Sequence, residues 1–255
     1  MSAHNGKRTV VVDCFEEQLG AYGEGCAIVA VDVIRATTTA VTGVACGRRC
    51  FPVASLEAAG RLARQLPQPL LVGELGGNMP FGFDLTNSPA ELQARTDLER
   101  PMVLLSTSGT RLLCAPAPPQ PVYAACLRNF RAQAAHLVAH HPTVAVLGAG
   151  TRGDFREEDQ LCCAWIAELL LQAGYAPQDA RTRALVERWS GAPVEAIAQG
   201  ASAAYLERSG QHRDLEFVLG HVDDLDGVYR LHGSELLRES APQPPLTYRD
   251  EHVWT

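Results

Sequence analysis

Residues 28–43 bring a carboxylate, a guanidinium and hydroxyl groups together where an apolar run ends. Asp32 closes the run, Arg35 follows three residues later, and hydroxyls come next at Thr37, Thr38 and Thr39. The run is typical of a strand buried on both faces, where a charge is costly. The hydroxyls fall where a helix would start, and the free N–H groups of a helix start favour an anion. The pattern indicates a reactive turn; an ordinary helix cap, with Arg35 paired to Asp32, is the alternative.

A second polar loop, residues 73–89, follows a short apolar run at 70–72. Its four glycines allow the backbone to approach a ligand closely. Apolar residues inside the loop weigh against a flexible surface connection, because they need a surface to pack on. The polar side chains that could face a ligand are Glu74, Asp84, Asn87 and Ser88.

A third loop follows the apolar run at 102–105 and consists of small hydroxyl residues around a glycine. Such residues at a strand end are the ingredients of an anion-binding nest, although a capped helix start would have the same composition. They are Ser106, Thr107, Ser108, Gly109 and Thr110.

A fourth loop, residues 148–159, begins with the glycine spacing of dinucleotide-binding proteins. The acids that follow, Asp154, Glu157, Glu158 and Asp159, would repel a pyrophosphate, and Glu157 and Glu158 also suit the start of a helix. The same acids suit a hard divalent cation, and Arg152 suits a phosphate or a sulfonate.

Lysine chemistry is excluded, because Lys7 in the N-terminal arm is the only lysine. A Walker-type phosphate loop and a Schiff base each need a lysine in the site. Together the strand ends therefore offer Asp32, Glu74 and Asp159 as Mg²⁺ ligands, with arginines and hydroxyls for an anion.

Composition restricts the partners. A net charge of −7 argues against nucleic acid, which requires a basic face. No apolar segment approaches the length of a membrane span, and the polar N-terminus indicates a cytoplasmic protein. The eight cysteines include no C-x-x-C pair and are expected to be free thiols. His136 and His140 lie one helical turn apart without an acid between them, so we assign them no metal.

Strand-like and helix-like segments alternate, which predicts a layered α/β/α fold around a largely parallel sheet. Ligands of such folds bind beyond the carboxyl ends of the strands, where the four loops fall. Strands are predicted at 8–13, 27–33, 50–53, 70–72, 102–105, 122–125, 143–147 and 216–219, and helices at 37–45, 55–66, 129–140 and 158–173. We expect a single α/β domain over 1–240 and a Pro-rich tail over 241–255; two lobes meeting near 130–142 are the alternative.

Several blocks, in this order, resemble the signature blocks of the 2-phosphosulfolactate phosphatase family. The resemblance runs from about residue 28 to 173 and is weak beyond 181. The blocks are Asp32 to Thr39, Gly73–Glu74, Gly82 to Asp84, Asn87 to Pro89, Thr107 to Thr110, Asn129, Ala149–Gly150 and Glu158–Asp159.

The resemblance implies a Mg²⁺-dependent phosphatase that hydrolyses 2-phospho-3-sulfolactate to 3-sulfolactate and phosphate, a step of coenzyme M biosynthesis. Catalysis is assigned to Asp32, Arg35, Glu74 and Asp159, three of them the metal ligands above. The chain departs from the family pattern at Ser108, where Asn is expected. Substrate contacts are expected from Thr37, Thr38, Thr39, Asn87, Ser88, Thr107, Ser108, Gly109, Thr110 and Arg152.

Other interpretations stay open at this point. Asp32 could act as a covalent nucleophile, although Ile34 stands where aspartyl-phosphate enzymes carry a second acid. The chain could bind a small phosphorylated or sulfonated anion without hydrolysing it. The chain could also be a nucleotide-dependent oxidoreductase, but only the glycines of 148–153 support that interpretation. Neither the true substrate nor assembly into a homo-oligomer follows from the sequence.

Overall fold

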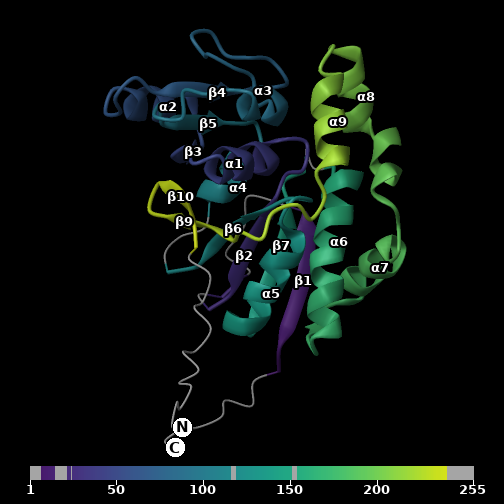
Figure 1. Cartoon of the computed structure of the whole chain (residues 1–255). Coiled ribbons are helices and arrows are strands. Elements are labelled where there is room, and N and C mark those ends of the chain that lie inside the picture. The colour runs from purple at the N-terminus through teal and green to yellow at the C-terminus, as the bar shows by residue number, and fades with distance from the viewer. Residues whose placement is uncertain (1–6, 15–21, 24, 116–118, 151–153, 240–255) are drawn as a thin grey trace, which may run out of the picture.

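A computed structural model describes residues 7–14, 22–23, 25–115, 119–150 and 154–239. In these ranges ten strands form one sheet in the order β4-β5-β3-β10-β9-β6-β2-β7-β1-β8, flanked by helices (Figure 1). The pairs that involve β9 and β10 are antiparallel and all other pairs are parallel. The predicted α/β fold with a largely parallel sheet is therefore confirmed.

The strands and helices alternate along most of the chain, as the sequence predicts. The strands are β1 Thr9–Cys14, β2 Ala27–Val31, β3 Cys50–Val53, β4 Leu70–Gly73, β5 Met102–Leu105, β6 Val122–Ala125, β7 Thr143–Gly148, β8 Ala176–Pro177, β9 Tyr229–His232 and β10 Glu235–Arg238. The helices are α1 Ala36–Ala45, α2 Leu56–Ala63, α3 Pro89–Gln93, α4 Gly109–Cys114, α5 Phe130–His140, α6 Glu157–Gln172, α7 Ala180–Trp189, the 3-10 helix η2 Val194–Gln199, α8 Ala201–Arg208 and α9 His212–Gly220.

Strand β2 lies in the middle of the sheet and is fully buried. Successive side chains of a strand point to opposite faces. Val29 and Val31 accordingly pack into the core on the side of α5 and α6, whereas Ile28 and Ala30 pack into the core on the side of α1 and α4. The apolar run that ends at Asp32 is thus explained by burial on both faces.

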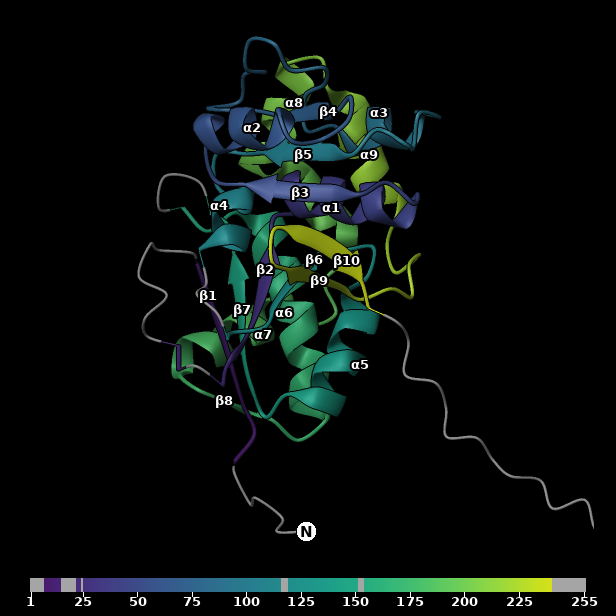
Figure 2. The ribbon, with the colours of Figure 1, turned by 90° about the vertical axis from the view of Figure 1, so that its left-hand side faces the viewer.

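The antiparallel hairpin β9–β10 divides the parallel strands into two groups, with β3 on one side and β6 on the other (Figure 2). The sequence analysis missed this hairpin. Its strands are four residues each, they are only partly buried, and their turn rests on Gly233 at a φ of 60°. Short, half-exposed strands leave little apolar alternation to read.

The predicted late strand at 216–219 is wrong, because these residues belong to α9. The buried side chains of α9 are Asp214, Leu215, Phe217 and Val218, which recur with helical spacing. The apolar run within 217–219 resembles a strand only when the residues before it are ignored. Helix α9 packs against α3 near the carboxyl ends of the parallel strands, where the polar loops lie (Figure 1).

The predicted Pro-rich tail at 241–255 lies outside the described residues. Within the described residues, no helix combines the length and the apolar character that crossing a membrane requires.

Candidate active site

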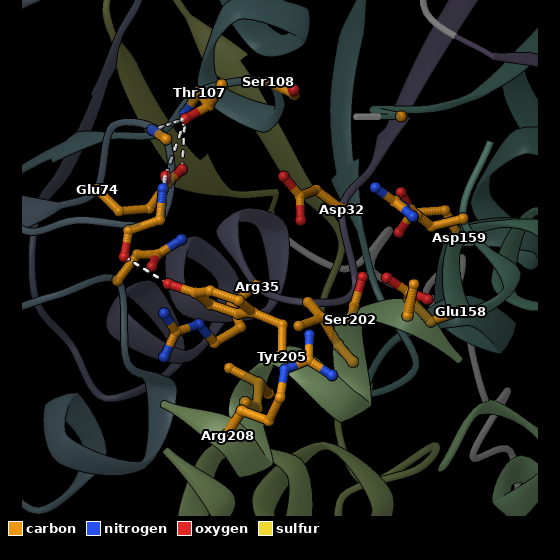
Figure 3. Close-up of a pocket in the computed structure, with 18 residues that line it drawn as sticks. Asp32, Arg35, Glu74, Thr107, Ser108, Glu158, Asp159, Ser202, Tyr205 and Arg208 are labelled. Carbon is orange, nitrogen blue, oxygen red and sulfur yellow. Dashed lines mark hydrogen bonds between the residues drawn. The ribbon is translucent and has the colours of Figure 1, made fainter. Parts of the chain in front are cut away.

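A cavity of about 400 Å³ lies at the carboxyl ends of β2, β4, β5 and β7, and α8 forms one wall of it. This is the edge of the sheet where ligands of parallel α/β folds bind. The four residues assigned to catalysis from the sequence, Asp32, Arg35, Glu74 and Asp159, all line it, although they come from three different loops (Figure 3).

Three carboxylates gather on one wall of the cavity, and we call Asp32, Glu158 and Asp159 the acid cluster (Figure 3). Asp32 directly follows β2, and its Oδ1 accepts the Ala36 N–H at 3.1 Å. The Oδ1 of Asp159, in the first turn of α6, accepts the Val33 N–H at 2.8 Å. These bonds hold the strand-to-helix turn after β2 against the start of α6. The alternative that Asp32 pairs with Arg35 is not what the structure shows, because Arg35 pairs with Asp214.

The acid cluster is desolvated, and its charges repel one another. Burial raises the pKa of Asp32 to about 7, and the charges of Glu74 and Glu158 act in the same direction. Burial, followed by the charges of Asp32 and Glu158, raises the pKa of Asp159. Burial also raises the pKa of Glu158. Carboxylates held this close in a low dielectric favour either protonation or a bound cation.

The acid cluster fits a divalent cation of the Mg²⁺ type. The Oε2 atom of Glu158 is buried without a hydrogen-bond partner among the described residues. The described ranges contain no group of three or more Asp, Glu, His or Cys side chains that could hold a metal ion by themselves. Mg²⁺ does not need such a site, because it keeps several waters and binds one or two carboxylates together with phosphate oxygens.

The Glu74 carboxylate connects two of the polar loops by hydrogen bonds and is not part of the acid cluster. Its carboxylate accepts the Thr107 N–H and the Thr107 hydroxyl at 2.7 and 2.8 Å, and the Gly77 N–H at 2.7 Å. Figure 3 shows this carboxylate directed at Thr107. The loop after β4 is thereby fixed to the loop after β5, and both loops reach the cavity.

Arg35 lines the cavity and is held from behind by a buried acid. Its guanidinium donates to Asp214 on α9, and the two side chains are 4% and 3% exposed. Asp214 also accepts the Ser88 hydroxyl at 2.5 Å, and the Ser88 Oγ accepts the Glu91 N–H that caps α3. Ser88 therefore positions α3 and Asp214 and does not itself line the cavity.

The threonine hydroxyls that follow Arg35 in the sequence form hydrogen bonds within the protein. Thr37, Thr38 and Thr39 donate to the carbonyl oxygens of Ala125, Val33 and Asn87, each at 2.7 Å. The Thr110 hydroxyl accepts the Ser106 N–H at 2.8 Å. None of these four residues lines the cavity. Their hydroxyls fix the turns that present the site, so direct substrate contacts by them find no support here.

Of the other residues assigned to the substrate, three line the cavity and one lies beside it. Asn87, Thr107 and Ser108 line it, and the side-chain oxygen of Asn87 is buried without a partner among the described residues. Gly109 lies behind Asp32, where a Cβ would meet the Asp32 Oδ2 at 2.2 Å. Arg152 lies outside the described residues.

Sequence reasoning missed the contribution of the C-terminal helices. Ser202, Tyr205 and Arg208 line the cavity from α8, and their three-residue spacing places them on one helix face. That spacing was the available signal, but polar residues at helical intervals usually mark a solvated face. Glu158 was named among the acids that suit a divalent cation and as a helix start, but it was not chosen as a metal ligand, and Arg156 and Asp214 were not assigned to the site.

The glycines at the start of the fourth loop have a packing role. A Cβ at Gly148 would meet Phe155 at 2.2 Å and the Cβ of Asp159 at 3.1 Å. Gly148 therefore allows α6 to approach β7 and bring Asp159 to the cavity. The last residues of the dinucleotide-like motif, 151–153, lie outside the described residues.

A sequence model of the 2-phosphosulpholactate phosphatase family matches residues 14–232. The chain belongs to this family. A probable 2-phosphosulfolactate phosphatase of Deinococcus radiodurans is 35% identical over 193 residues, which cover 74% of this chain and 80% of that protein. One of Parasynechococcus marenigrum is 34% identical over 211 residues, covering 79% and 87%. One of Pseudothermotoga lettingae is 40% identical over 139 residues, covering 54% and 59%.

The 2-phosphosulpholactate phosphatase match extends well past the blocks that carried the resemblance. It includes β7, α6 and α8, and so takes in every element that lines the cavity. Family membership, predicted from blocks within 28–173, is confirmed. The acid cluster and the α8 wall both lie inside the domain that defines the family.

Proposed function

We propose that the chain is a Mg²⁺-dependent phosphatase that hydrolyses 2-phospho-3-sulfolactate to 3-sulfolactate and phosphate. The observation that carries the proposal is the acid cluster, in which three buried carboxylates face a cavity that arginines also line. Membership of the 2-phosphosulpholactate phosphatase family and relatives named as probable 2-phosphosulfolactate phosphatases support the choice of substrate.

Asp32 and Asp159 would hold the metal ion, and Glu74 and Glu158 are the candidates for a third ligand. The Glu74 carboxylate already accepts hydrogen bonds from Thr107 and Gly77, whereas Glu158 has a buried oxygen without a partner among the described residues, which favours Glu158. When bound, Mg²⁺ would polarise a phosphoryl oxygen and neutralise charge on the transferred group.

The side chains around the acid cluster would orient the ester. Arg35, held by Asp214, presents a fixed guanidinium, whose N–H donors suit the oxygens of a phosphate. Asn87 offers a side-chain amide at the cavity wall. Positioning of this kind supplies most of the catalysis in phosphoryl transfer.

A water activated by the metal or by a carboxylate of the acid cluster would attack the phosphorus in line with the leaving oxygen. The covalent role of Asp32 is the weaker alternative, because Ile34 occupies the place of the second acid that such enzymes use and the only lysine is Lys7.

We further propose a cytoplasmic location and a place in coenzyme M biosynthesis. The net charge of −7 argues against a nucleic-acid partner.

Phosphate release from 2-phospho-3-sulfolactate tests the proposal. The purified chain should release phosphate and 3-sulfolactate in stoichiometric amounts when Mg²⁺ is present, and excess chelator should stop the release. Recovery of the intact ester after binding would instead support a receptor without catalysis, and would overturn the proposed hydrolysis.

A further inference from the structure

Helix α8 presents one polar face to the cavity. Ser202, Tyr205 and Arg208 follow one another at three-residue intervals and all line the cavity. Figure 3 shows the Arg208 side chain entering the cavity beside Ser202 and Tyr205. Glu207 and Arg208 are both exposed, but only Arg208 lines the cavity.

A hydrogen bond fixes α8 against the loop after β4. The Tyr205 hydroxyl donates to the Gly77 carbonyl at 2.7 Å. A Cβ at Gly77 would lie 2.5 Å from that hydroxyl oxygen, so the close approach requires glycine. Tyr205 thus sets the distance between α8 and the loop. The backbone of Arg208, in the same helix, is thereby held at a fixed position beside the cavity.

Arg208 differs from the other two arginines of the cavity in how its charge is balanced. Arg35 pairs with Asp214 in the interior, and Arg156 lies 4.0 Å from Asp154. For Arg208, no carboxylate of a described residue lies within ion-pair distance. The α8 wall therefore carries a cationic group whose charge is left for a ligand.

We propose that Arg208 determines specificity by binding the second anionic group of the substrate, a sulfonate or a carboxylate, while the acid cluster serves the phosphate. The proposal rests on the proposed phosphatase function. A guanidinium binds either anion through two parallel N–H donors. A cavity of about 400 Å³ has room for a three-carbon acid that carries both groups.

Calorimetric binding of two anions to the Mg²⁺-loaded chain tests the proposal without requiring turnover. The anions are 3-sulfolactate, which lacks the phosphate, and inorganic phosphate, which lacks the second group. Loss of a charge-assisted pair predicts that Arg208→Gln raises the Kd of 3-sulfolactate by about 10- to 100-fold. The Kd of inorganic phosphate should stay unchanged. Arg213→Gln is the control, because Arg213 is exposed on α9 and does not line the cavity.

The outcomes separate this proposal from the proposed phosphatase activity. An equal effect of Arg208→Gln on both anions, no effect on either, or no binding of 3-sulfolactate to the wild-type chain would overturn the role of Arg208. Selective weakening of 3-sulfolactate binding supports it, even if the ester is recovered intact. In that case the proposed phosphatase activity would be refuted, whereas the proposed anion-binding role of Arg208 would be supported. In an active enzyme the variant should raise KM for 2-phospho-3-sulfolactate far more than it lowers kcat.

Discussion

Replacing Asp214 with Asn should destabilise the protein more than any exposed charge substitution. Asp214 is the buried partner of Arg35, and both side chains are almost fully shielded from solvent. Asparagine keeps an oxygen for the Ser88 hydroxyl but removes the charge, so Arg35 stays buried without a counter-ion. Breaking a buried pair in this way costs about 3–5 kcal/mol of unfolding free energy. For a chain of this length that corresponds to a fall in Tm of roughly 6–20 °C.

Urea unfolding of Asp214→Asn beside Asp226→Asn measures this cost. Asp226 pairs with Arg238 at 2.7 Å, but these side chains are 92% and 53% exposed. An exposed pair contributes only about 0–1 kcal/mol. A double-mutant cycle with Arg35→Gln should show that the double variant loses less than the sum of the single losses, because no charge is then left unpaired. Equal unfolding free energies for Asp214→Asn and Asp226→Asn would refute the assignment of Asp214 as the support of Arg35.

Three further changes test other parts of the structure. Asp32→Asn should lower kcat by about 10²- to 10⁴-fold, the effect expected when a carboxylate that helps to activate the attacking water is removed. Its Tm should be equal or higher, because a desolvated charge is lost, and near-normal turnover would show that Asp32 has only a structural role. Gly109→Ala should impair activity and lower Tm, because its Cβ would meet the Asp32 carboxylate at 2.2 Å, and an active variant with wild-type Tm would contradict that contact. Burial and the charge of neighbouring His136 lower the pKa of His141 to about 4, from 6.5. At this residue the unfolded chain binds more protons between these values, so the contribution of His141 to stability falls as pH drops from 6.5 to 4, whereas the acid cluster contributes in the opposite direction. The Tm of His141→Gln relative to the wild type should therefore rise as pH drops from 6.5 to 4, and a constant difference would exclude this role of His141.

The sequence predicted the strand-end loops well because each follows a parallel strand that is largely buried. The apolar runs before Asp32 and after Pro142 could only be strands covered on both faces. Once their carboxyl ends share one edge, Asp32, Glu74 and Asp159 must face the same region. All three do line one cavity.

The roles within that region could not be read from residue type. The Thr37 hydroxyl suits an anion in sequence, but its nearest acceptor is the Ala125 carbonyl, which only the packing of β6 beside β2 supplies. Glu74 was assigned to the metal from its residue type, and nothing in the sequence indicated that its carboxylate also accepts the Thr107 N–H. Long-range pairings of this kind depend on the fold and leave no local signature.

The C-terminal part of the site was missed for a related reason. Asp214 and Arg208 lie in helices whose polar residues resemble a solvated surface, yet α9 brings Asp214 to Arg35 across 179 positions of the chain. The late apolar run was read as a strand because its helical neighbours were not counted.

Titration of Mg²⁺ during phosphate release from 2-phospho-3-sulfolactate, with the wild-type chain and Glu158→Gln, tests the central claim most directly. The claim is that the acid cluster holds the metal on which hydrolysis depends. Wild-type release should rise from zero with Mg²⁺, and loss of a carboxylate at the metal should raise the half-activating Mg²⁺ concentration by about 10- to 100-fold in Glu158→Gln. Glu157→Gln, its neighbour in α6 outside the cavity lining, should titrate like the wild type. Full activity in excess chelator, or identical titrations of Glu158→Gln and the wild type, would contradict the account.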